Sequence, residues 1–272
     1  MANVLSAEFD QVLAPSSSTP SSSPARLTMI DLRQGAYRVR EALNERDRLA
    51  AFRLRFSVFN LELKEGLDSA DRTGLDQDEF DPVCDHLIVE RVGSDQVVGT
   101  YRLQTGPMAR TNLGYYSERE FKFLPYEPLR AKMVELGRAC IHRDHRSTDV
   151  LYLLWRGIAQ YAQRWGGRYL VGCSSLTSQD AANGNAVYES LRGYLVSPVL
   201  RTTPQPQFAL PFVSDRHASG HVPKLLRTYL AIGAKICGPP AIDREFKTID
   251  FLTWLDLENL HPRIRARFLP ER

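Results

Sequence analysis

Two charged residues interrupt an apolar segment in the middle of the chain. Residues 134–142 read VELGRACIH, in which Glu135 and Arg138 stand among residues typical of a β-strand. On the two-residue period of a strand, the two side chains should point to opposite faces of a sheet. A carboxylate in a partly dry cleft has a raised pKa and can remove a proton, directly or through water. We therefore predict that Glu135 acts as a general base, or else that it pairs with an arginine such as Arg102 and holds the sheet together.

Acidic residues are concentrated in residues 64–82, which we expect to form a long loop. Long loops inside domains are often functional. Three of its aspartates could bind a cationic, amine-bearing acceptor, and the alternative is that they belong to a solvated acidic loop: Asp76, Asp78 and Asp81. Arg138 could pair with one of these aspartates, or it could bind the carboxylate of a substrate.

Three further residues could take part in chemistry, and each also has a purely structural interpretation. Arg102 lies in a predicted strand, where an unpaired charge is costly, so we expect Glu135 or Asp81 to be its partner. His86 could be a base or a hydrogen-bonded histidine of the core. Cys173 could form an acyl-enzyme. Nothing beside it in the sequence would activate a thiolate, so we expect a small core residue instead.

The composition is ordinary for a globular protein. The 272 residues are 43% apolar and 25% charged, and the formal net charge is +3. A charge this small does not support nucleic-acid binding, although it is compatible with an acidic partner or an anionic membrane surface. The four cysteines are widely spaced without a CxxC pattern, so we expect neither a metal site nor a disulfide framework, and a cytoplasmic location. The sequence shows neither a run of 18 apolar residues nor the pattern of a signal peptide.

We expect one folded domain between two tails. Residues 1–30 include the Ser/Pro-rich stretch APSSSTPSSSP and are predicted to be disordered. Residues 31–257 should form the folded domain. Residues 258–272 carry four arginines against two glutamates. This basic C-terminal tail could rest on an anionic leaflet, or it could be a frayed, solvated end.

Strands and helices alternate only partly along the domain. Asn44 should cap a helix whose apolar face includes Phe52 and Phe59. Strands are predicted at residues 36–43, 85–92, 96–103, 134–142, 168–175 and 206–213. Further helices are predicted from Ser147 or Thr148 to Trp165, over residues 185–195 and after residue 221. Because several strands follow one another directly, we predict an α/β fold with a central mixed sheet flanked by helices.

This order of elements resembles the core of the GCN5-related N-acyltransferases (the GNAT fold). In that core, two neighbouring strands splay apart and the pantetheine arm of the acyl donor lies between them. On this resemblance the splayed strands are residues 133–142 and 168–174, and NAVYESLRGY (185–194) contains the short helix that follows. Cys140 and Ser174, one on each strand, would then line the donor arm. No GxGxxG or GxxxxGK[ST] pattern supports a dinucleotide site or a P-loop.

Several motifs narrow the resemblance to a subgroup. RFSVF (55–59), DQDEFD (76–81), GTYRL (99–103) and ELGR (135–138) are similar in order and spacing to acyl-homoserine-lactone synthases. Other motifs resemble those of the hemolysin-like acyltransferases, which include the ornithine N-acyltransferases. These motifs are CDHLIV (84–89), LLWRGIAQY (153–161), GCSSL (172–176) and GAKICGPPAIDREFKTIDFLTWLDL (233–257). The resemblance implies transfer of a 3-hydroxyacyl chain from acyl carrier protein to the α-amine of ornithine, giving lyso-ornithine lipid.

The resemblance also implies roles for individual residues. Glu135, Arg138 and Asp81 would form the catalytic site, and Asp81 matches the subgroup motif most closely. Arg55, on the polar side of its helix, would have a structural or substrate-organising role. The residues that bind the acceptor would be Arg102, Asp76, Asp78, Arg55 and His86. The late residues that could close the acceptor or acyl pocket are Asp243, Phe246 and Asp250.

The loop HRDHRST (142–148) stands where acetyltransferases carry a glycine-rich loop that binds the coenzyme A pyrophosphate. This loop has no glycine. A carrier-protein arm ends in a single phosphodiester, which Arg143, Arg146 and the helix N-terminus at Ser147 could bind. The resemblance thus favours the 4'-phosphopantetheine of acyl carrier protein as co-substrate, with no other cofactor and no metal. Arg156 and Arg164 could dock the acidic face of the carrier protein.

Two alternatives stay open. The same chemistry could act on another amine, such as glycine, another amino acid or an S-adenosylmethionine-derived acceptor. The other alternative is a non-catalytic, membrane-associated protein that keeps the fold. The presence of Glu135, Arg138 and Asp81 favours an enzyme, located in the cytoplasm or at the periphery of the inner membrane.

Overall fold

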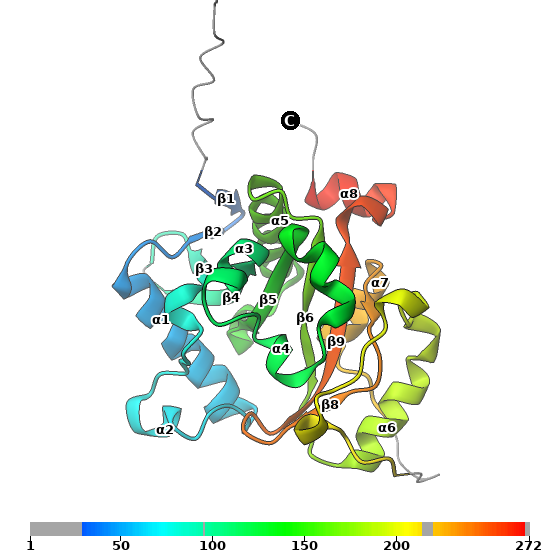
Figure 1. Cartoon of the computed structure of the whole chain (residues 1–272). Coiled ribbons are helices and arrows are strands. Elements are labelled where there is room, and N and C mark those ends of the chain that lie inside the picture. The colour runs from blue at the N-terminus through cyan, green and yellow to red at the C-terminus, as the bar shows by residue number, and fades with distance from the viewer. Residues whose placement is uncertain (1–28, 95, 214–219, 270–272) are drawn as a thin grey trace, which may run out of the picture.

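A single mixed β-sheet organises this protein. The computed structural model describes residues 29–94, 96–213 and 220–269, and within them the sheet has nine strands. In chain order the strands are β1 (Asp31–Gln34), β2 (Tyr37–Glu41), β3 (Asp85–Arg91), β4 (Val97–Thr105), β5 (Met133–Ile141), β6 (Tyr169–Leu176), β7 (Lys235–Ile236), β8 (Ala241–Asp243) and β9 (Thr248–Asp256). Strands β1 to β5 form an antiparallel meander, β6 runs parallel to β5, and β9 returns antiparallel beside β6 (Figure 1). Both β7 and β8 pair with β9. The predicted mixed sheet is confirmed.

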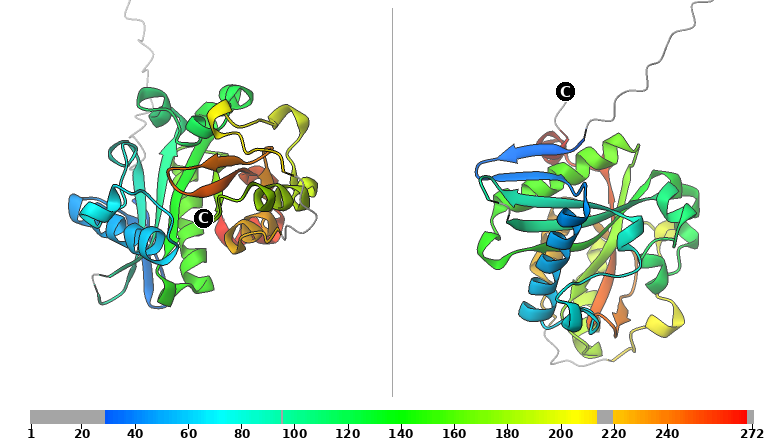
Figure 2. Two further views of the ribbon diagram at one scale, coloured as in Figure 1. Left: turned by 90° about the horizontal axis from the view of Figure 1, so that it is seen from below. Right: turned by 90° about the vertical axis from the view of Figure 1, so that its left-hand side faces the viewer.

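Two long helices cover opposite faces of the sheet (Figure 2). α1 (Glu45–Phe56) continues as a π-helical segment, Ser57–Glu62, and packs on β3, β4 and β5. α5 (Thr148–Arg164) packs on the other face, against β1 to β5. Both helices begin where the sequence indicates, because the side chains of Asn44 and Ser147 accept hydrogen bonds from backbone amides of the first turn.

The remaining elements are short. They are the helices α2 (Ala70–Thr73), α3 (Gly106–Thr111), α4 (Ser117–Glu120), α6 (Ala181–Ser190), α7 (Lys224–Ala231) and α8 (Pro262–Phe268). The predicted strand at 206–213 is wrong. Pro206–Phe208 is a 3-10 turn, and Ala209 forms only an isolated bridge. Pro206 and Pro211 have no N–H group to donate to a neighbouring strand, which explains why this apolar run does not pair.

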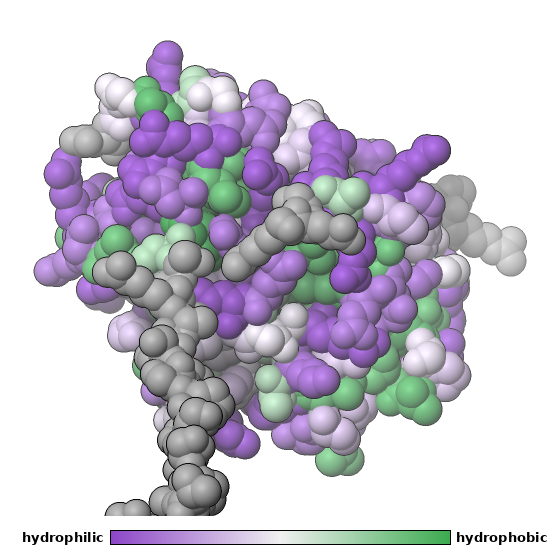
Figure 3. Space-filling model, turned by 90° about the horizontal axis from the view of Figure 1, so that it is seen from above, coloured by the Kyte–Doolittle hydropathy of each residue, from purple (hydrophilic) through white to green (hydrophobic). Residues whose placement is uncertain are grey.

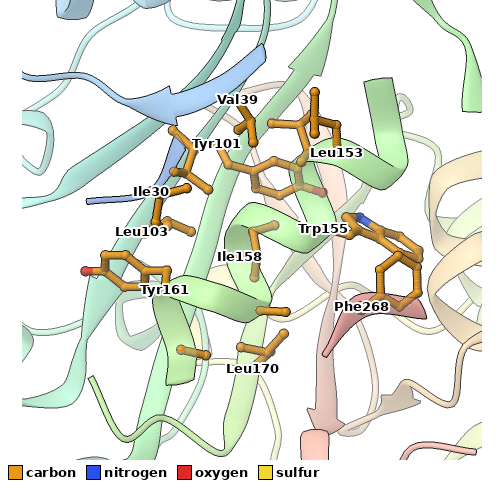
Figure 4. Close-up of a cluster of buried hydrophobic side chains, with 14 of the residues drawn as sticks. Ile30, Val39, Tyr101, Leu103, Leu153, Trp155, Ile158, Tyr161, Leu170 and Phe268 are labelled. Atoms are coloured by element: carbon orange, nitrogen blue, oxygen red, sulfur yellow. The ribbon is translucent and has the colours of Figure 1, made fainter. Parts of the chain in front are cut away.

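The largest hydrophobic cluster lies between α5 and the sheet (Figure 4). Leu153 and Ile158 of α5 pack in this cluster with Val39 of β2 and Leu103 of β4. Full burial of each such side chain contributes roughly 1.5–3 kcal/mol. The cluster therefore fixes α5 on the sheet, and with it the helix N-terminus at Ser147.

β5 and β6 part soon after they meet. Their parallel register covers three positions and ends at Glu135 and Val171. Where the strands part, Gly172 lies so close to β5 that a Cβ atom on it would stand 2.2 Å from the carbonyl oxygen of Leu136. Only glycine fits at this position. The predicted splay of these two strands is confirmed, and it opens the gap in which the candidate site lies.

The C-terminal residues belong to the folded domain, so the basic tail predicted at 258–272 is wrong for the part that is described. Helix α8 packs on α5, and the ring centroids of Phe268 and Trp155 lie 5.2 Å apart. Apolar residues at helical spacing among the arginines explain this packing, because one side of the helix can be buried while the arginines face outward. At the other end Ile30 is also buried. Residues 1–28 of the predicted disordered tail lie outside the described residues.

None of the described helices is long and apolar enough to cross a membrane. Figure 1 places α8 at the top of the molecule, and the view from above in Figure 3 shows mostly hydrophilic side chains with apolar ones in small groups. The arginines of α8 therefore lie at a largely polar end of the molecule.

Removing the Phe268 ring tests whether the C-terminal helix is part of the core. Phe268→Ala should lower the free energy of unfolding by about 3 kcal/mol, because a buried ring is lost from a packed cluster. Urea unfolding followed by tryptophan fluorescence measures the change. The control Arg263→Ala, on the exposed side of α8, should stay within about 0.5 kcal/mol of the wild type. Equal stability of the two variants would contradict the packing.

Candidate active site

A cavity of about 730 Å³ passes through the gap between β5 and β6. On the side of α5 its lining is mainly apolar and aromatic and includes Tyr101, Leu151, Trp155, Leu226, Tyr229, Leu255 and Phe268. On the side of α1 the lining includes Glu65, Tyr116, Glu135, Arg138, Asp243 and Asp250. A cavity of this size with an apolar half and convergent polar groups is typical of a small-molecule site.

Glu135 and Arg138 lie on the same side of the sheet, so the prediction of opposite faces is wrong. Between the positions where Gly137 and Cys140 pair with β4, β5 has one residue more than β4. Arg138 sits in this β-bulge, with φ at 50° in the left-handed region. The extra residue reverses the alternation of side chains, and Arg138 consequently shares the α1 face with Glu135.

Three arginines and three aspartates form an ion-pair network beside the cavity. This arginine–aspartate network consists of Arg55, Arg102, Arg138, Asp76, Asp78 and Asp81, with side chains at most 6% exposed. Arg55 donates to Asp76 at 2.7 Å and to the two carboxylate oxygens of Asp81 at 2.7 and 2.9 Å. The sequence suggested that Arg55 lies on the polar side of its helix. It is instead fully buried, because residues 76–81 fold over α1.

The other two arginines complete the network. Arg102 donates to Asp78 at 2.5 Å and to Asp81 at 3.2 Å, and Arg138 donates to Asp78 at 2.7 Å. Burial alone would raise the pKa of Asp78, but Arg102 and Arg138 outweigh burial and hold that pKa below its usual value. The interpretation of Asp76, Asp78 and Asp81 as solvated acids is therefore wrong, since these three aspartates are buried and matched by arginines. Of the two partners expected for Arg102, the structure shows Asp81.

The surroundings of His86 and Cys173 match the structural alternatives, a hydrogen-bonded core histidine and an unreactive cysteine. The Nε2 atom of His86 lies 3.1 Å from the carbonyl oxygen of Asp81, and burial lowers the pKa of the ring to about 4. The ring is therefore uncharged at neutral pH. Burial, together with Glu120 and Asp250, raises the pKa of the Cys173 thiol well above its usual value. This thiol lines the cavity but stays protonated, so it is not an activated nucleophile.

Glu135 lines the cavity and binds the start of α4. Its Oε1 accepts hydrogen bonds from the amide and the hydroxyl of Ser117, at 2.8 and 2.6 Å, and its Oε2 accepts one from the amide of Tyr116 at 2.8 Å. Burial raises the pKa of Glu135 even though these bonds favour the carboxylate. Its hydrogen-bond partners are these residues rather than Arg102. In the described part of the chain Oε2 has no second donor, so its other lone pair can accept a proton.

A second group of buried acids was not predicted from the sequence as one site: three of its members line the cavity and the fourth, Glu120, lies behind them, next to Asp250. Its members, here called the acidic cluster, are Glu65, Glu120, Asp243 and Asp250. Burial is the main cause that raises the pKa of Glu65 to about 7 and that of Asp250 to about 6, and neighbouring carboxylates add to it. Asp243 and Asp250 come from the stretch expected to close the pocket. Glu65 belongs to the acidic loop but was not predicted as a site residue, and no sequence pattern pointed to Glu120.

Most residues predicted to hold the donor line the cavity. Arg146 and Ser147 line it beside the start of α5, and Cys140 and Ser174 line it from the splayed strands. Arg146 is also held by an ion pair to the π-helical segment after α1. Arg143 has a side chain 73% exposed and lies outside the lining.

The two arginines suggested for docking a carrier protein differ in availability. Arg164 forms a buried ion pair with Glu41 and is not available to a partner. Arg156 lines a separate small pocket together with Gln34. Only Arg156 therefore stays a candidate.

Breaking the arginine–aspartate network should be costly. Asp81→Asn should lower the free energy of unfolding by about 3–5 kcal/mol, because three buried arginines are then matched by only two carboxylates, Asp76 and Asp78, and one positive charge is left uncompensated. Chemical denaturation measures the change. Glu79→Gln, at an exposed position of the same loop, is the matched control and should change stability by less than about 0.5 kcal/mol. If both variants unfold at the same urea concentration, the network does not stabilise the fold.

Neutralising an acid of the acidic cluster should have the opposite effect on stability from neutralising Asp81. The pKa of Glu65 is raised to about 7 in the fold, so its contribution is fully present below the unfolded pKa, near 4.3, and is lost as the pH rises through 7. Glu65→Gln should therefore stabilise the ligand-free protein by about 1–3 kcal/mol at pH 8, and by less at pH 5. Unfolding at both pH values checks this. A variant less stable than the wild type at pH 8 would show that the carboxylate is compensated after all.

Proteins of known activity resemble this chain over most of its length. The family model of the acetyltransferase (GNAT) domain matches residues 54–156. The L-ornithine N(alpha)-acyltransferase of Agrobacterium fabrum is 30% identical over 272 residues, covering 94% of this chain and 92% of that protein. The corresponding protein of Rhodobacter capsulatus is 28% identical over 244 residues, covering 85% and 93%. The crystal structure of the AHL synthase LasI has the same fold, with a TM-score of 0.52 at 12% identity over 87% of this chain and 96% of that one. This chain therefore belongs to the L-ornithine N(alpha)-acyltransferase family and is an acyltransferase with the GNAT fold.

Proposed function

We propose that this protein transfers a 3-hydroxyacyl chain from the phosphopantetheine thioester of acyl carrier protein to the α-amine of ornithine, giving lyso-ornithine lipid. The observation that carries this proposal is the two-sided cavity, whose apolar half and acidic half meet in the gap between β5 and β6. An acyl chain fits the first half and a cationic amine fits the second. The names of the curated relatives support ornithine as the acceptor.

The apolar half suits a fatty acyl chain. Trp155 of α5, Tyr229 of α7 and Phe268 of α8 form its aromatic wall. Burial of a chain there contributes about 0.8 kcal/mol per methylene group. At the wide end of the gap, the N-terminus of α5 at Ser147 and the side chain of Arg146 offer N–H groups to the phosphate of the donor arm.

The chemistry requires a neutral amine beside the thioester. At neutral pH the α-amine of ornithine is protonated, and we assign its proton to the free lone pair of Glu135, directly or through water. The nitrogen then attacks the thioester carbon. As the tetrahedral intermediate collapses, the C–N bond is retained and the C–S bond breaks. The nitrogen gives up its second proton to the leaving sulfur, directly or through water, and the thiol leaves with the donor arm. Backbone amides of β5 beyond Glu135, where pairing with β6 has ended, would stabilise the oxyanion.

Arg138 and Asp81 are assigned supporting roles. Arg138 uses Nη2 to bind Asp78 and lies 4.3 Å above the centroid of the Phe246 ring. Its Nη1 lies 3.7 Å from Oδ2 of Asp76, and the N–H groups that do not face Asp76 or Asp78 could bind the carboxylate of the acceptor. Asp81 accepts three hydrogen bonds from Arg55 and Arg102 and a fourth from the backbone amide of Asp78, so it would position these arginines and not touch the substrate.

An acyl-transfer assay tests this function. Purified protein with 3-hydroxyacyl-acyl carrier protein and a panel of amines should give N-acylornithine, detected by mass spectrometry. Glu135→Gln should lower kcat about 100-fold or more, because a positioned base contributes at least that much, whereas the exposed Glu79→Gln should behave as wild type. A strong product with glycine or another amine and none with ornithine would contradict the acceptor. Equal use of the coenzyme A thioester would contradict the carrier-protein donor.

A further inference from the structure

The two sets of buried acids at the cavity differ in their counter-charges. The aspartates of the arginine–aspartate network are matched by three arginines. In the acidic cluster, Glu65, Glu120, Asp243 and Asp250 are at most 6% exposed, and no ion pair joins them to a lysine, arginine or histidine of the described chain. The guanidinium of Arg138 is bound to Asp78. Because buried carboxylates are costly without a counter-charge, this end of the cavity favours a positive charge that the residues in the described ranges do not supply.

Three oxygen atoms at this end can accept further hydrogen bonds. The Oδ1 atom of Asp250 is buried without any partner among the described residues. Glu65 accepts from the Thr177 hydroxyl at Oε2, 2.7 Å away, and its Oε1 has no donor in the described part of the chain. Among the residues that the structure describes, the Oδ2 atom of Asp243 accepts from the Tyr116 hydroxyl alone, which leaves one lone pair. An ammonium group has three N–H donors and matches such a set.

The backbone around Glu65 is held in an unusual conformation. Both neighbours, Lys64 (φ 59°) and Gly66 (φ 92°), lie in the left-handed region. For a residue such as Lys64 this conformation costs roughly 1–2 kcal/mol. The Gly66 amide donates to the carbonyl of Phe246 at 3.3 Å and fixes the turn. A strained turn that delivers an uncompensated carboxylate into a cavity does not stabilise the fold, so it indicates a ligand-binding role.

We infer that the acidic cluster is a subsite for the second ammonium group of a diamino acid, with Glu65 and Asp250 as its main contacts, so that the enzyme selects diamino acids over monoamino acids. This inference rests on the proposed function. Glu65, Asp250, Glu135 and Arg138 all line the α1 side of the same cavity. One short molecule can therefore place its α-amine near Glu135 and its distal amine in the cluster.

The titration of the cluster agrees with a cationic ligand. Burial raises the pKa values of Glu65 and Asp250. Repulsion by Asp250 adds to the rise for Glu65, which the Thr177 hydroxyl and Arg138 oppose. Repulsion by Asp243 adds to the rise for Asp250, which hydrogen bonds from neighbouring side chains oppose. An ammonium group between the carboxylates would reverse this repulsion and stabilise their charged forms.

A divalent cation is the alternative ligand. Glu120, Cys173 and Asp250 place one ligand atom each within 4.8 Å of one another, and the site holds no ion. A metal-binding cysteine must be a thiolate. Without an ion, burial and the adjacent carboxylates keep the Cys173 thiol protonated. A bound cation would reverse this, so the experiment below includes removal and addition of metal.

L-Norvaline is the matched probe, because it is ornithine with the distal ammonium group replaced by hydrogen. The wild type should have a KM for ornithine about 30-fold or more below that for norvaline, the effect expected of a buried charge pair. Asp250→Asn and Glu65→Gln should raise the KM for ornithine by about the same factor and leave that for norvaline close to the wild-type value. Asp68→Asn, an exposed acid of the same loop, should change neither.

Isothermal titration calorimetry, without an acyl donor, measures the affinity for the two amino acids and so repeats the comparison independently of turnover. An enzyme that acylates no amine would count against the proposed function, while the binding preference would still decide the inference. Equal affinity of the wild type for ornithine and norvaline would contradict the subsite. An equal loss of affinity for both amino acids in the variants would contradict it as well. Protein treated with EDTA should keep its preference for ornithine. A preference that appears only with added Mg²⁺ or Zn²⁺ would assign the cluster to a metal instead.

Discussion

The peptide groups of β5 and β6 cannot all bond to one another, because the two strands diverge after three paired positions. Backbone groups left unpaired in an interior are costly unless water or a ligand satisfies them. Gly172 allows the closest approach where the strands part, and the bulge at Arg138 redirects β5 just beyond that point. The cavity follows from this divergence, and so does the meeting of an apolar half from one face of the sheet with an acidic half from the other.

Electrostatics then gives the two walls of the acidic half different properties. The arginine–aspartate network ties Arg55 of α1, Arg102 of β4 and Arg138 of β5 to one loop, and breaking any buried pair would leave an uncompensated charge. That wall is rigid and nearly neutral. The acidic cluster has no such partners among the described residues, so its charged forms are disfavoured until a ligand supplies the counter-charge. Stability resides in the first wall and selectivity in the second.

The elements that could be predicted are those with local signals. Asn44 and Ser147 cap their helices, and alternating or continuous apolar runs mark the strands of the meander. The failures have physical causes. The run at 206–213 is apolar, but its prolines remove ladder donors. The arginine-rich end looked like a solvated tail because the surface that it covers, around Trp155, is distant in the sequence. Arg55 looked exposed because its burial depends on aspartates that a loop brings over it.

By itself, the sequence determined the order of strands and helices, the motifs of an acyltransferase family, and the placing of Glu135 and Arg138 in one strand at the gap. Tertiary structure alone decided that these two side chains share a face. A bulge on β5 interrupts the alternation of its side chains, and the sequence does not show where such a bulge occurs. It also decided which acids are matched and which are not. Coulomb energies depend on distances in space, and residues as far apart in the chain as Glu65 and Asp250 become neighbours only when the loop, the splayed strand and β9 are packed together.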